Sequence, residues 1–241
     1  MAETIVLLHG FAGTHRAWDG VVEALGAQRY IAAAPDLRGH GSAAALRPID
    51  FAACAADILA LAPERFALCG YSLGGRVALH VALSAPARVT RLVLVATTAG
   101  IDDPAERAER RAADLALADA TAAGTIADFV ARWSAQPLFA GDPPGMAGVW
   151  QADMRRNDPA ALAEVLRGIG TGAMEPLWDR LGELTMPVTV VAGERDAKFV
   201  ALGERLAAAL PDARLVIVPG AGHGLPREAP GAVAEALRAA G

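Results

Sequence analysis

Short apolar runs alternate with helix-length patterns along most of the 241-residue chain. Each run is continuously hydrophobic and is bounded by glycine, proline or aspartate, which is typical of strands covered on both faces of a parallel sheet. The predicted strands are Thr4–Leu8, Tyr30–Ala34, Phe66–Gly70, Arg91–Ala96, Val188–Gly193 and Arg214–Val218. The helical patterns between them cover residues 15–27, 50–62, 73–85, 198–209 and 228–239. This alternation predicts an α/β fold with a doubly wound, mostly parallel sheet and right-handed crossovers.

One long interval interrupts the alternation. Between Ala96 and Val188 lie about 90 residues without a convincing strand, and a structureless loop of that length is improbable in a compact domain. The helical patterns inside it are Pro104–Ala123, Ile126–Ser134, Pro159–Gly168 and Glu175–Leu184. We therefore predict a core made of residues 1–98 and 187–241, with residues 99–186 forming a helical cap. Because ligands of open α/β sheets bind at the carboxyl ends of the strands, the cap should shape the substrate pocket there.

The composition is typical of a compact soluble protein. Hydrophobic residues make up 54% of the chain, charged residues 20%, and the formal net charge is -5. A nucleic-acid-binding domain normally carries a basic face, and no run reaches the roughly 18 apolar residues of a membrane-spanning helix. The sequence enters a predicted strand at once, without a basic leader or cleavage site, so we expect a cytoplasmic protein that binds neither nucleic acid nor membrane.

The two cysteines, Cys54 and Cys69, stand alone in hydrophobic patterns and match neither a disulfide framework nor a zinc site. We expect buried, inert thiols. No pattern indicates a metal or an organic cofactor. The oligomeric state stays open between a monomer and a homo-oligomer.

Residues 70–76 read G-Y-S-L-G-G-R and contain the G-x-S-x-G spacing of a nucleophile elbow. In that motif a serine occupies a sharp turn between a strand and a helix, and the segments around Ser72 predict such a turn. Gly70 and Gly74 lie two residues to either side, where neighbouring backbone comes too close to tolerate side chains.

Two further candidates also follow predicted strands. Asp196 lies in A-G-E-R-D after the fifth strand, and His223 lies in P-G-A-G-H-G after the sixth. Each residue alone has an ordinary structural explanation, but the order Ser–Asp–His with three separate strand ends is that of α/β-hydrolases. His223 would take a proton from Ser72 while Asp196 orients the ring. A serine at this place excludes subclasses whose nucleophile is an aspartate, such as epoxide hydrolases and haloalkane dehalogenases.

An oxyanion hole needs two backbone N–H groups near the serine. We predict that the amides of Phe11, in L-L-H-G-F-A-G, and of Leu73 supply them. His9 is expected to brace its loop and not to carry protons. The residues of P-D-L-R-G-H-G-S expected to hold that turn are Asp36, Arg38 and His40.

Arg76 occupies an unusual position for a cation. It falls in the first turn of the helix that the elbow opens, where the helix dipole is positive and a cation costs about 0.3–1 kcal/mol at an exposed site. A nearby anion would remove that penalty. Arg76 therefore indicates an anionic ligand.

Several segments resemble one family of this fold, the 2-succinyl-6-hydroxy-2,4-cyclohexadiene-1-carboxylate synthases of menaquinone biosynthesis. They are L-H-G-F-A-G-T, G-Y-S-L-G-G-R, E-R-A-E-R-R-A-A-D, F-V-A-R-W-S-A-Q-P-L-F, L-R-G-I-G-T-G-A, L-W-D-R-L and G-E-R-D-A-K-F. The resemblance runs from about residue 5 to residue 230 and includes the predicted cap. The elbow and triad segments are generic, whereas W-x-x-Q-P-L-F and L-R-G-x-G-T-G are more specific.

The resemblance implies a lyase that eliminates pyruvate from 2-succinyl-5-enolpyruvyl-6-hydroxy-3-cyclohexene-1-carboxylate. The triad serine, primed by the histidine, would take a proton from carbon without forming an acyl-enzyme. Three carboxylates on the substrate require local cations in an acidic protein. The residues implied at the substrate are Tyr71, Arg76, Arg110, Trp133, Arg155 and Lys198.

The chain departs from the family pattern at three places that bear on the succinyl arm. Met154 stands where the family usually has a further arginine, with Arg155 directly after it. Ser134 replaces an aromatic residue, and Pro226 replaces a second histidine.

Alternatives remain for single residues and for the function. Arg110 has Glu106 and Asp114 at four-residue spacing, so local ion pairs on a solvated face also explain it. Trp133 is equally typical of an anchor for the cap core. The main alternative function is a serine carboxylesterase that hydrolyses small acyl esters through an acyl-enzyme at Ser72. A third is a non-catalytic ligand-binding protein on the same scaffold.

Overall fold

The computed structural model describes residues 2–26, 29–139 and 145–239. Its centre is a six-stranded, entirely parallel sheet with the strand order β2-β1-β3-β4-β5-β6. The strands are β1 (Glu3–Leu8), β2 (Tyr30–Ala33), β3 (Phe66–Tyr71), β4 (Val89–Val95), β5 (Val188–Gly193) and β6 (Ala213–Val218). All six predicted strands are confirmed, with ends that differ by at most two residues, and β3 and β5 are buried along their whole length.

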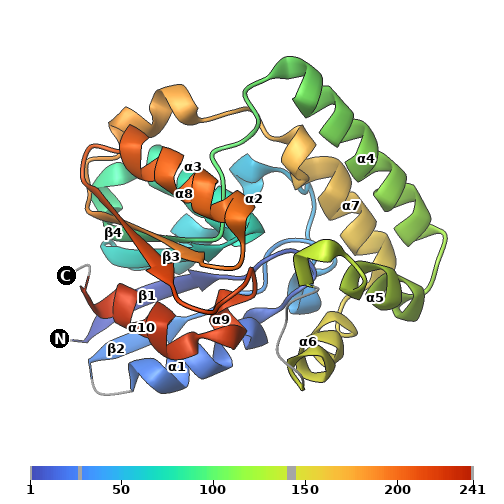
Figure 1. Ribbon diagram of the computed structural model, residues 1–241, viewed down its shortest axis with the longest axis horizontal. Helices are drawn as coiled ribbons and strands as arrows, with labels where there is room; N and C mark the ends of the chain where they lie inside the picture. Colours follow the sequence, from blue (N-terminus) through green and yellow to red (C-terminus); the bar gives the residue numbers. More distant parts are fainter. Residues whose placement is uncertain (1, 27–28, 140–144, 240–241) are drawn as a thin grey trace.

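Helices cover both faces of the sheet (Figure 1). One face carries α1 (Asp19–Leu25) and α10 (Pro230–Ala239), whose apolar side chains share a core with Ile5, Leu7 and Val93. The other face carries α2 (Phe51–Leu61), α3 (Leu73–Ser84) and α8 (Ala197–Ala209). The doubly wound α/β-hydrolase architecture predicted from the sequence is therefore confirmed.

Two predicted helices divide into shorter elements. The pattern at 15–27 becomes a 3-10 turn, His15–Trp18, followed by α1. The pattern at 228–239 becomes α9 (Leu225–Glu228) and α10, because the helix breaks at Ala229 before Pro230. Proline lacks the N–H group that would continue the helical hydrogen bonds.

Among the described residues between β4 and β5 are four α-helices, which lie to one side of the sheet in Figure 1: α4 (Pro104–Ala122), α5 (Ile126–Ser134), α6 (Met146–Met154) and α7 (Pro159–Ile169). Side-chain caps begin three of them, since Asp103, Thr125 and Asp158 each accept a hydrogen bond from the third residue that follows. The sequence did not predict α6. Residues 175–184 form no α-helix either: a 3-10 segment, Trp178–Glu183, buries Leu181 in the core beneath the sheet. The division of the chain into a core of residues 1–98 and 187–241 and a helical cap of residues 99–186 stays a prediction.

In the described part of the chain, no helix combines the length and the hydrophobicity needed to cross a membrane. Both cysteines are buried with free thiols, and burial raises the pKa of Cys54 to about 12. The prediction of buried thiols is confirmed.

Candidate active site

Ser72 lies at the turn between β3 and α3 in a strained conformation. Its φ of 51° falls in the region that residues other than glycine rarely adopt. A Cβ atom on Gly70 would come within 2.2 Å of the Gly74 carbonyl oxygen, and one on Gly74 within 2.1 Å of the Leu8 carbonyl oxygen. Only glycine fits at either position, so the two glycines that the motif supplies allow the sharp turn.

The structure brings the three predicted triad residues together. His223 Nδ1 lies 2.7 Å from Asp196 Oδ2, and His223 Nε2 lies 3.3 Å from Ser72 Oγ. His223 is 3% exposed and Asp196 is 9% exposed. With its Nδ1–H donated to the carboxylate, the ring presents Nε2 to the serine hydroxyl. This arrangement can take a proton from Ser72 and hold it.

A buried carboxylate that the sequence analysis missed fixes the glycine-rich loop around His223. Glu228 Oε2 accepts a hydrogen bond from the Gly222 amide, and Glu228 Oε1 accepts one from the Gly224 amide, each at 2.8 Å. Arg195 Nη2 donates to Glu228 at 2.6 Å. The amides on both sides of His223 are therefore held by one side chain. The only signal in the sequence was an acidic residue five positions after the histidine. That spacing predicts nothing by itself, because the contacts depend on how the loop folds around the carboxylate.

Phe11 and Leu73, whose amides are predicted to form the oxyanion hole, both line the cavity at Ser72. Among the described residues, neither amide donates a hydrogen bond to a protein acceptor. His9 is buried, donates from Nδ1 to the Gly10 carbonyl at 2.9 Å and accepts at Nε2 from the Leu37 amide at 3.0 Å. Burial lowers its pKa, which keeps the ring neutral. The prediction that His9 braces its loop is confirmed.

The charged residues of P-D-L-R-G-H-G-S hold their own turn, as predicted. Asp36 accepts hydrogen bonds from the amides of His15 and Ser42 and from the Ser42 hydroxyl. Burial alone would raise the pKa of Asp36, but these hydrogen bonds hold it well below its usual range. Arg38 pairs with Asp57 at 2.6 and 2.8 Å. None of these groups lines the cavity at Ser72.

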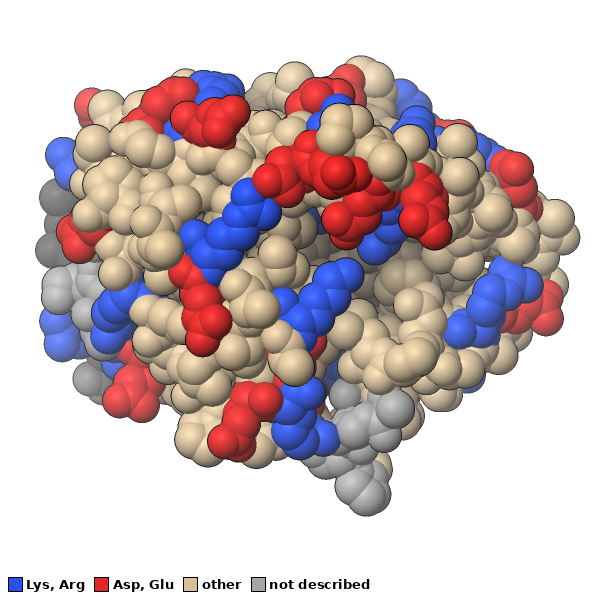
Figure 2. Space-filling model, turned by 45° about the horizontal axis from the view of Figure 1, so that its top comes forward, with Lys and Arg blue, Asp and Glu red and all other residues tan. Residues whose placement is uncertain are grey.

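That cavity has a volume of about 250 Å³ and lies between the sheet edge and the α4–α7 layer. A smaller space of about 150 Å³ adjoins it and shares six lining residues with it: Ser72, Arg76, Arg110, Thr171, Lys198 and Phe199. In the space-filling view, basic side chains reach into the hollow on this face, and acidic side chains border it on one side (Figure 2).

Arg76 is a buried cation in the wall of this cavity, with 7% of its surface exposed. Its Nη1 donates to the carbonyl of Ile169 at 2.7 Å, at the carboxyl end of α7 where the helix dipole is negative. Within the described ranges, no acidic side chain forms an ion pair with it. Burial and then the neighbouring Arg110 lower its pKa to about 9, so the guanidinium stays charged at neutral pH. The carboxylate of Asp114 attracts the guanidinium, but it is already paired with Arg110. A buried cation without an ion-pair partner of its own favours an anion from outside.

Arg110 and Lys198 also line both spaces. Arg110 Nε donates to Asp114 Oδ1 at 2.8 Å, and Asp114 accepts from the Gly172 amide as well. The alternative of a local ion pair is thus confirmed for Arg110, although its side chain still reaches the cavity. Lys198 is exposed, and it is the only lysine in the sequence, a feature that the sequence analysis overlooked.

Trp133 lines the cavity and also anchors the neighbouring helices. Its ring packs edge-on against Phe11 at 4.9 Å and stacks over Phe129 at 5.9 Å. The anchoring role expected for Trp133 is confirmed, and its contact with the substrate stays a prediction.

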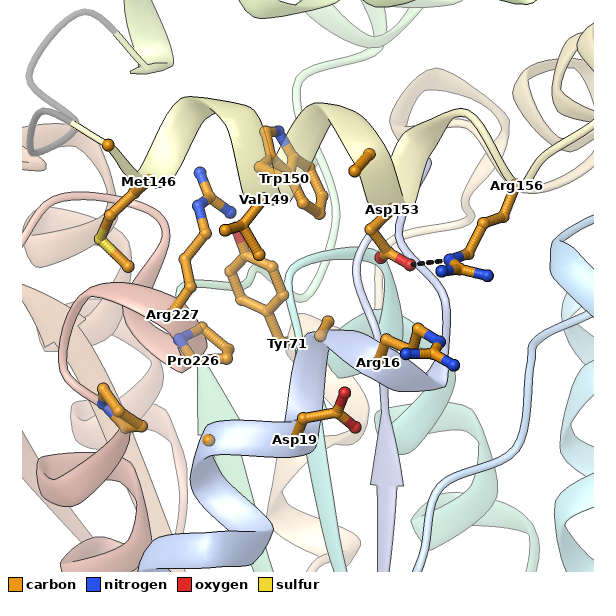
Figure 3. A pocket seen from close by; sticks show the side chains of 15 residues that line it. Arg16, Asp19, Tyr71, Met146, Val149, Trp150, Asp153, Arg156, Pro226 and Arg227 are labelled. Atoms are coloured by element: carbon orange, nitrogen blue, oxygen red, sulfur yellow. Dashed lines mark ion pairs between the residues drawn. The ribbon is translucent and has the colours of Figure 1, made fainter.

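Two residues predicted at the substrate do not line the space at Ser72. Tyr71 is buried and borders a separate cavity of about 500 Å³, between α1, α6 and α9 (Figure 3). Its ring nevertheless packs beside that of His223, with the ring centroids 5.5 Å apart, so Tyr71 adjoins the triad. Arg155 is exposed after the end of α6 and lines neither space, while Met154 is buried against Phe129 and its neighbours. The position predicted for Arg155 was wrong, and a contact of Tyr71 with the substrate stays a prediction.

Residues 5–236 match the family model described as "Alpha/beta hydrolase family". The chain belongs to the alpha/beta hydrolase family. A Bacillus subtilis (strain 168) member, named provisionally as a 2-succinyl-6-hydroxy-2,4-cyclohexadiene-1-carboxylate synthase, is 36% identical over 95% of this chain and 86% of its own length. The synthase of that name from Salmonella schwarzengrund (strain CVM19633) is 33% identical over 98% of this chain and 92% of its own. Among solved structures of the family, MenH from S. aureus superposes with a TM-score of 0.93 at 28% identity, covering 99% of this chain and 92% of that one.

Proposed function

We propose that this member of the alpha/beta hydrolase family is a lyase of menaquinone biosynthesis. It converts 2-succinyl-5-enolpyruvyl-6-hydroxy-3-cyclohexene-1-carboxylate to 2-succinyl-6-hydroxy-2,4-cyclohexadiene-1-carboxylate and pyruvate. The observation that carries the proposal is the buried Arg76 guanidinium in the same cavity as Ser72 and His223. A triad serine beside a buried cation that forms no ion pair with the described residues is suited to an anionic substrate, and the two curated relatives above bear the name of this synthase.

The difference between substrate and product defines the chemistry as a 1,4-elimination. His223 Nε2 takes the hydroxyl proton of Ser72, and the serine oxygen takes the proton from ring carbon 2, which is acidic because it adjoins the succinyl ketone. The C2–H electron pair forms the C2=C3 bond, the C3=C4 pair moves to C4=C5, and the C5–O bond breaks. Pyruvate leaves as its enolate, and the proton held at His223 Nε2 passes to the enolate carbon. Ser72 has its hydrogen again from ring carbon 2, so the triad returns to its starting state.

The backbone amides of Phe11 and Leu73 serve this step by stabilising charge. As the C2–H bond breaks, negative charge develops on the succinyl ketone oxygen. Two amides aimed at that oxygen lower the barrier, because they are already oriented before the charge appears. Removing one such donor typically costs about 10²–10³-fold in rate.

The cations in the cavity wall bind the carboxylates of a small anionic substrate. Arg76 offers the deepest positive charge, while Arg110 and Lys198 are nearer to solvent and Trp133 adds an apolar surface. A guanidinium can bind a carboxylate through two parallel hydrogen bonds, which fixes its orientation as well as its position. The proposal keeps the cytoplasmic location expected from the sequence and leaves the choice between a monomer and a homo-oligomer open.

A carboxylesterase is the second candidate, since the 3.3 Å approach of Ser72 Oγ to His223 Nε2 and the two amides also suit acyl transfer. One paired assay separates the two. The protein is incubated with the enolpyruvyl substrate while pyruvate is followed through lactate dehydrogenase, and separately with p-nitrophenyl butyrate while nitrophenol is followed. The lyase predicts pyruvate release that is lost in Ser72→Ala. Fast ester turnover without pyruvate would establish the esterase instead, and saturable ligand binding without turnover would favour a binding protein.

A further inference from the structure

The peptide that presents the Phe11 amide belongs to a tight turn. The carbonyl of that same peptide, on Gly10, accepts hydrogen bonds from His9 Nδ1 at 2.9 Å and from the Gly13 amide at 3.1 Å. Ala12 takes the third position of this turn with a φ of 62°, where glycine is the usual residue. An alanine persists in such a conformation when its surroundings hold it there.

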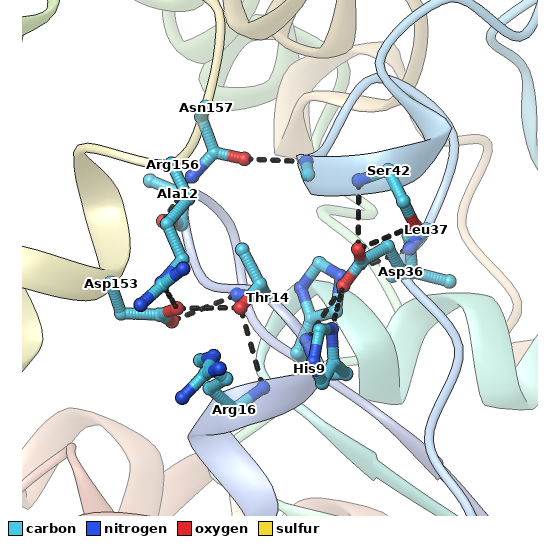
Figure 4. Close-up of polar contacts among 12 residues, drawn as sticks. His9, Ala12, Thr14, Arg16, Asp36, Leu37, Ser42, Asp153, Arg156 and Asn157 are labelled. Carbon is cyan, nitrogen blue, oxygen red and sulfur yellow. Dashed lines mark hydrogen bonds and ion pairs between the residues drawn. The ribbon is translucent and has the colours of Figure 1, made fainter.

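Polar groups from other parts of the chain form hydrogen bonds with this turn and the residues after it (Figure 4). The Ala12 amide donates to His40 Nε2 at 3.2 Å, and the Ala12 carbonyl accepts from Asn157 Nδ2 at 2.8 Å. Farther along, the Thr14 amide donates to Asp153 Oδ2 at 2.9 Å and the Thr14 hydroxyl to Asp153 Oδ1 at 2.5 Å. The two peptide groups that flank the Cα of Ala12 are therefore both fixed from outside the turn.

Two of these three partners, Asp153 and Asn157, come from the helical segment between β4 and β5. Asp153 lies in the last turn of α6 and Asn157 directly after that helix, whereas His40 comes from a loop beneath the sheet edge. Asn157 Oδ1 also accepts from the Gly41 amide at 3.0 Å, so one side chain ties both loops to α6. Asp153 and Asn157 are 8% and 6% exposed.

We propose that Asp153 and Asn157 are positioning residues that aim the Phe11 amide, so that the seating of α6 completes the oxyanion hole. Neither residue lines the cavity at Ser72, and neither touches the triad. Their effect passes through Thr14 and Ala12 to the peptide that carries the donor. The inference rests on the proposed use of the Phe11 amide as an oxyanion donor.

The placement matters because an oxyanion donor acts over a narrow range, with its nitrogen about 2.7–3.1 Å from the oxygen that becomes charged. If α6 loses its hold, Ala12 can relax toward negative φ, which rotates the Phe11–Ala12 peptide. That rotation disturbs the hydrogen bond from the Gly13 amide to the Gly10 carbonyl, which fixes the peptide carrying the Phe11 amide. Substrate binding through the cations of the cavity does not require that peptide. The proposal therefore predicts a fall in kcat with little change in KM.

Two variants test it by different chemistry. Asn157→Asp keeps the oxygen that accepts from the Gly41 amide and removes the donor to the Ala12 carbonyl. Thr14→Val keeps the shape of the side chain and removes the hydroxyl bonded to Asp153, while Thr14→Ser restores it. Thr125→Val is the matched control, because it breaks a threonine–aspartate hydrogen bond of 2.7 Å at the start of α5, away from the turn.

Two readouts keep this inference separate from the proposed function. The first is kcat and KM for pyruvate release. The second is the rate at which a fluorophosphonate labels Ser72: the serine oxygen attacks phosphorus, fluoride leaves, and the phosphoryl oxygen occupies the oxyanion hole. The labelling rate reports on the hole even if no pyruvate is formed, so failure of the proposed function does not obscure the result.

We expect Asn157→Asp and Thr14→Val to lower kcat and the labelling rate about 10–100-fold, a large part of the loss of one donor. KM should change less than about threefold, Thr14→Ser should recover most of the rate, and Thr125→Val should keep both rates at the parent level. Folded variants that label and turn over at the parent rate would overturn the proposal. Losses shared equally by Thr125→Val would also overturn it, because they would indicate general destabilisation.

Discussion

The two sides of the cavity are built on opposite principles. The side formed by the sheet edge is saturated with internal hydrogen bonds, since Asp196 holds His223 and Glu228 holds the amides beside it. The other side, where Arg76 of α3 reaches the end of α7 and Lys198 of α8 is exposed, presents cations whose charge is only partly compensated. The first arrangement orients reactive groups in advance, and the second leaves binding capacity for a charged ligand. Reaction type and substrate choice therefore depend on different side chains of one cavity, and mutations can separate them.

The largest effect should come from the serine. Ser72→Ala removes the group that both candidate reactions require, so kcat for pyruvate release should fall about 10⁴-fold or more. Ser84→Ala, which removes a hydroxyl bonded to a backbone carbonyl at the end of α3, is the matched control and should keep full activity. Steady-state assays of both variants check this. Residual turnover above 10% in Ser72→Ala would exclude a serine-dependent reaction.

The next largest effect should come from the buried cation. Arg76→Ala should lower kcat/KM about 10²–10³-fold, since a charge-assisted, oriented contact with a carboxylate is lost, and Arg76→Lys should recover only part of it. Arg88→Ala is a close control: Arg88 also donates to backbone carbonyls and lies over an aromatic ring, at 5.7 Å compared with 5.9 Å for Arg76.

An uncharged substrate and the Arg88→Ala control together separate the catalytic side of the cavity from its binding side. Turnover of the uncharged ester p-nitrophenyl butyrate should survive Arg76→Ala and vanish in Ser72→Ala. If Arg76→Ala and Arg88→Ala had equal effects on pyruvate release, Arg76 would be a structural residue only.

Glu228→Gln tests whether the saturated side depends on its hydrogen bonds. The amide nitrogen of glutamine cannot accept from Gly222 or Gly224, so one of the two amides beside His223 loses its partner. We expect kcat to fall about tenfold and the melting temperature to fall by about 2–4 °C, from roughly 1 kcal/mol of lost stability. Glu183→Gln, at an exposed ion pair with Arg180, should change neither. Unchanged kcat in Glu228→Gln would show that the loop needs no clamp.

The lowered pKa of His40 predicts that acid destabilises the folded protein. Burial and then the neighbouring His9 lower its pKa to about 3 from the usual 6.5. Between these values the unfolded chain binds a proton that the folded protein does not, so stability falls as pH drops below 6.5. His40→Gln should reduce the drop in melting temperature between pH 7.5 and pH 5. Thermal unfolding followed by circular dichroism measures it, and an unchanged drop would locate the acid sensitivity in other groups.

The smallest effect should come from Lys198. It is exposed, so Lys198→Ala should raise KM only about two- to fivefold and leave kcat unchanged, while Lys198→Arg should be near the parent. Because the chain has no second lysine, acetylation of the protein changes this side chain and the terminal amine alone. Acetylation that changes KM as much in Lys198→Arg as in the parent would assign the effect to the terminus.

The residues that could be predicted from the sequence are those fixed by local patterns. Six strands, the elbow glycines around Ser72 and the order of Asp196 and His223 are written in short segments, and parallel strands bring their carboxyl ends to one edge. The errors concern the directions of side chains and helices without clear periodicity. Arg155 was predicted at the substrate, but it lies directly after the end of α6 and is exposed. The roles of Glu228 and α6 depend on contacts that the pattern of the sequence does not reveal.

The central claim is that Ser72 acts as a base beside a carboxylate-binding wall. The most direct measurement is to mix the protein with the enolpyruvyl substrate, quench the reaction in milliseconds, and measure both the pyruvate formed and the mass of the peptide that contains Ser72. We predict that pyruvate accumulates while the peptide keeps its unmodified mass throughout, and that deuterium at ring carbon 2 slows the single turnover. An acyl adduct on Ser72 that appears and decays in step with turnover, with no isotope effect, would contradict the account.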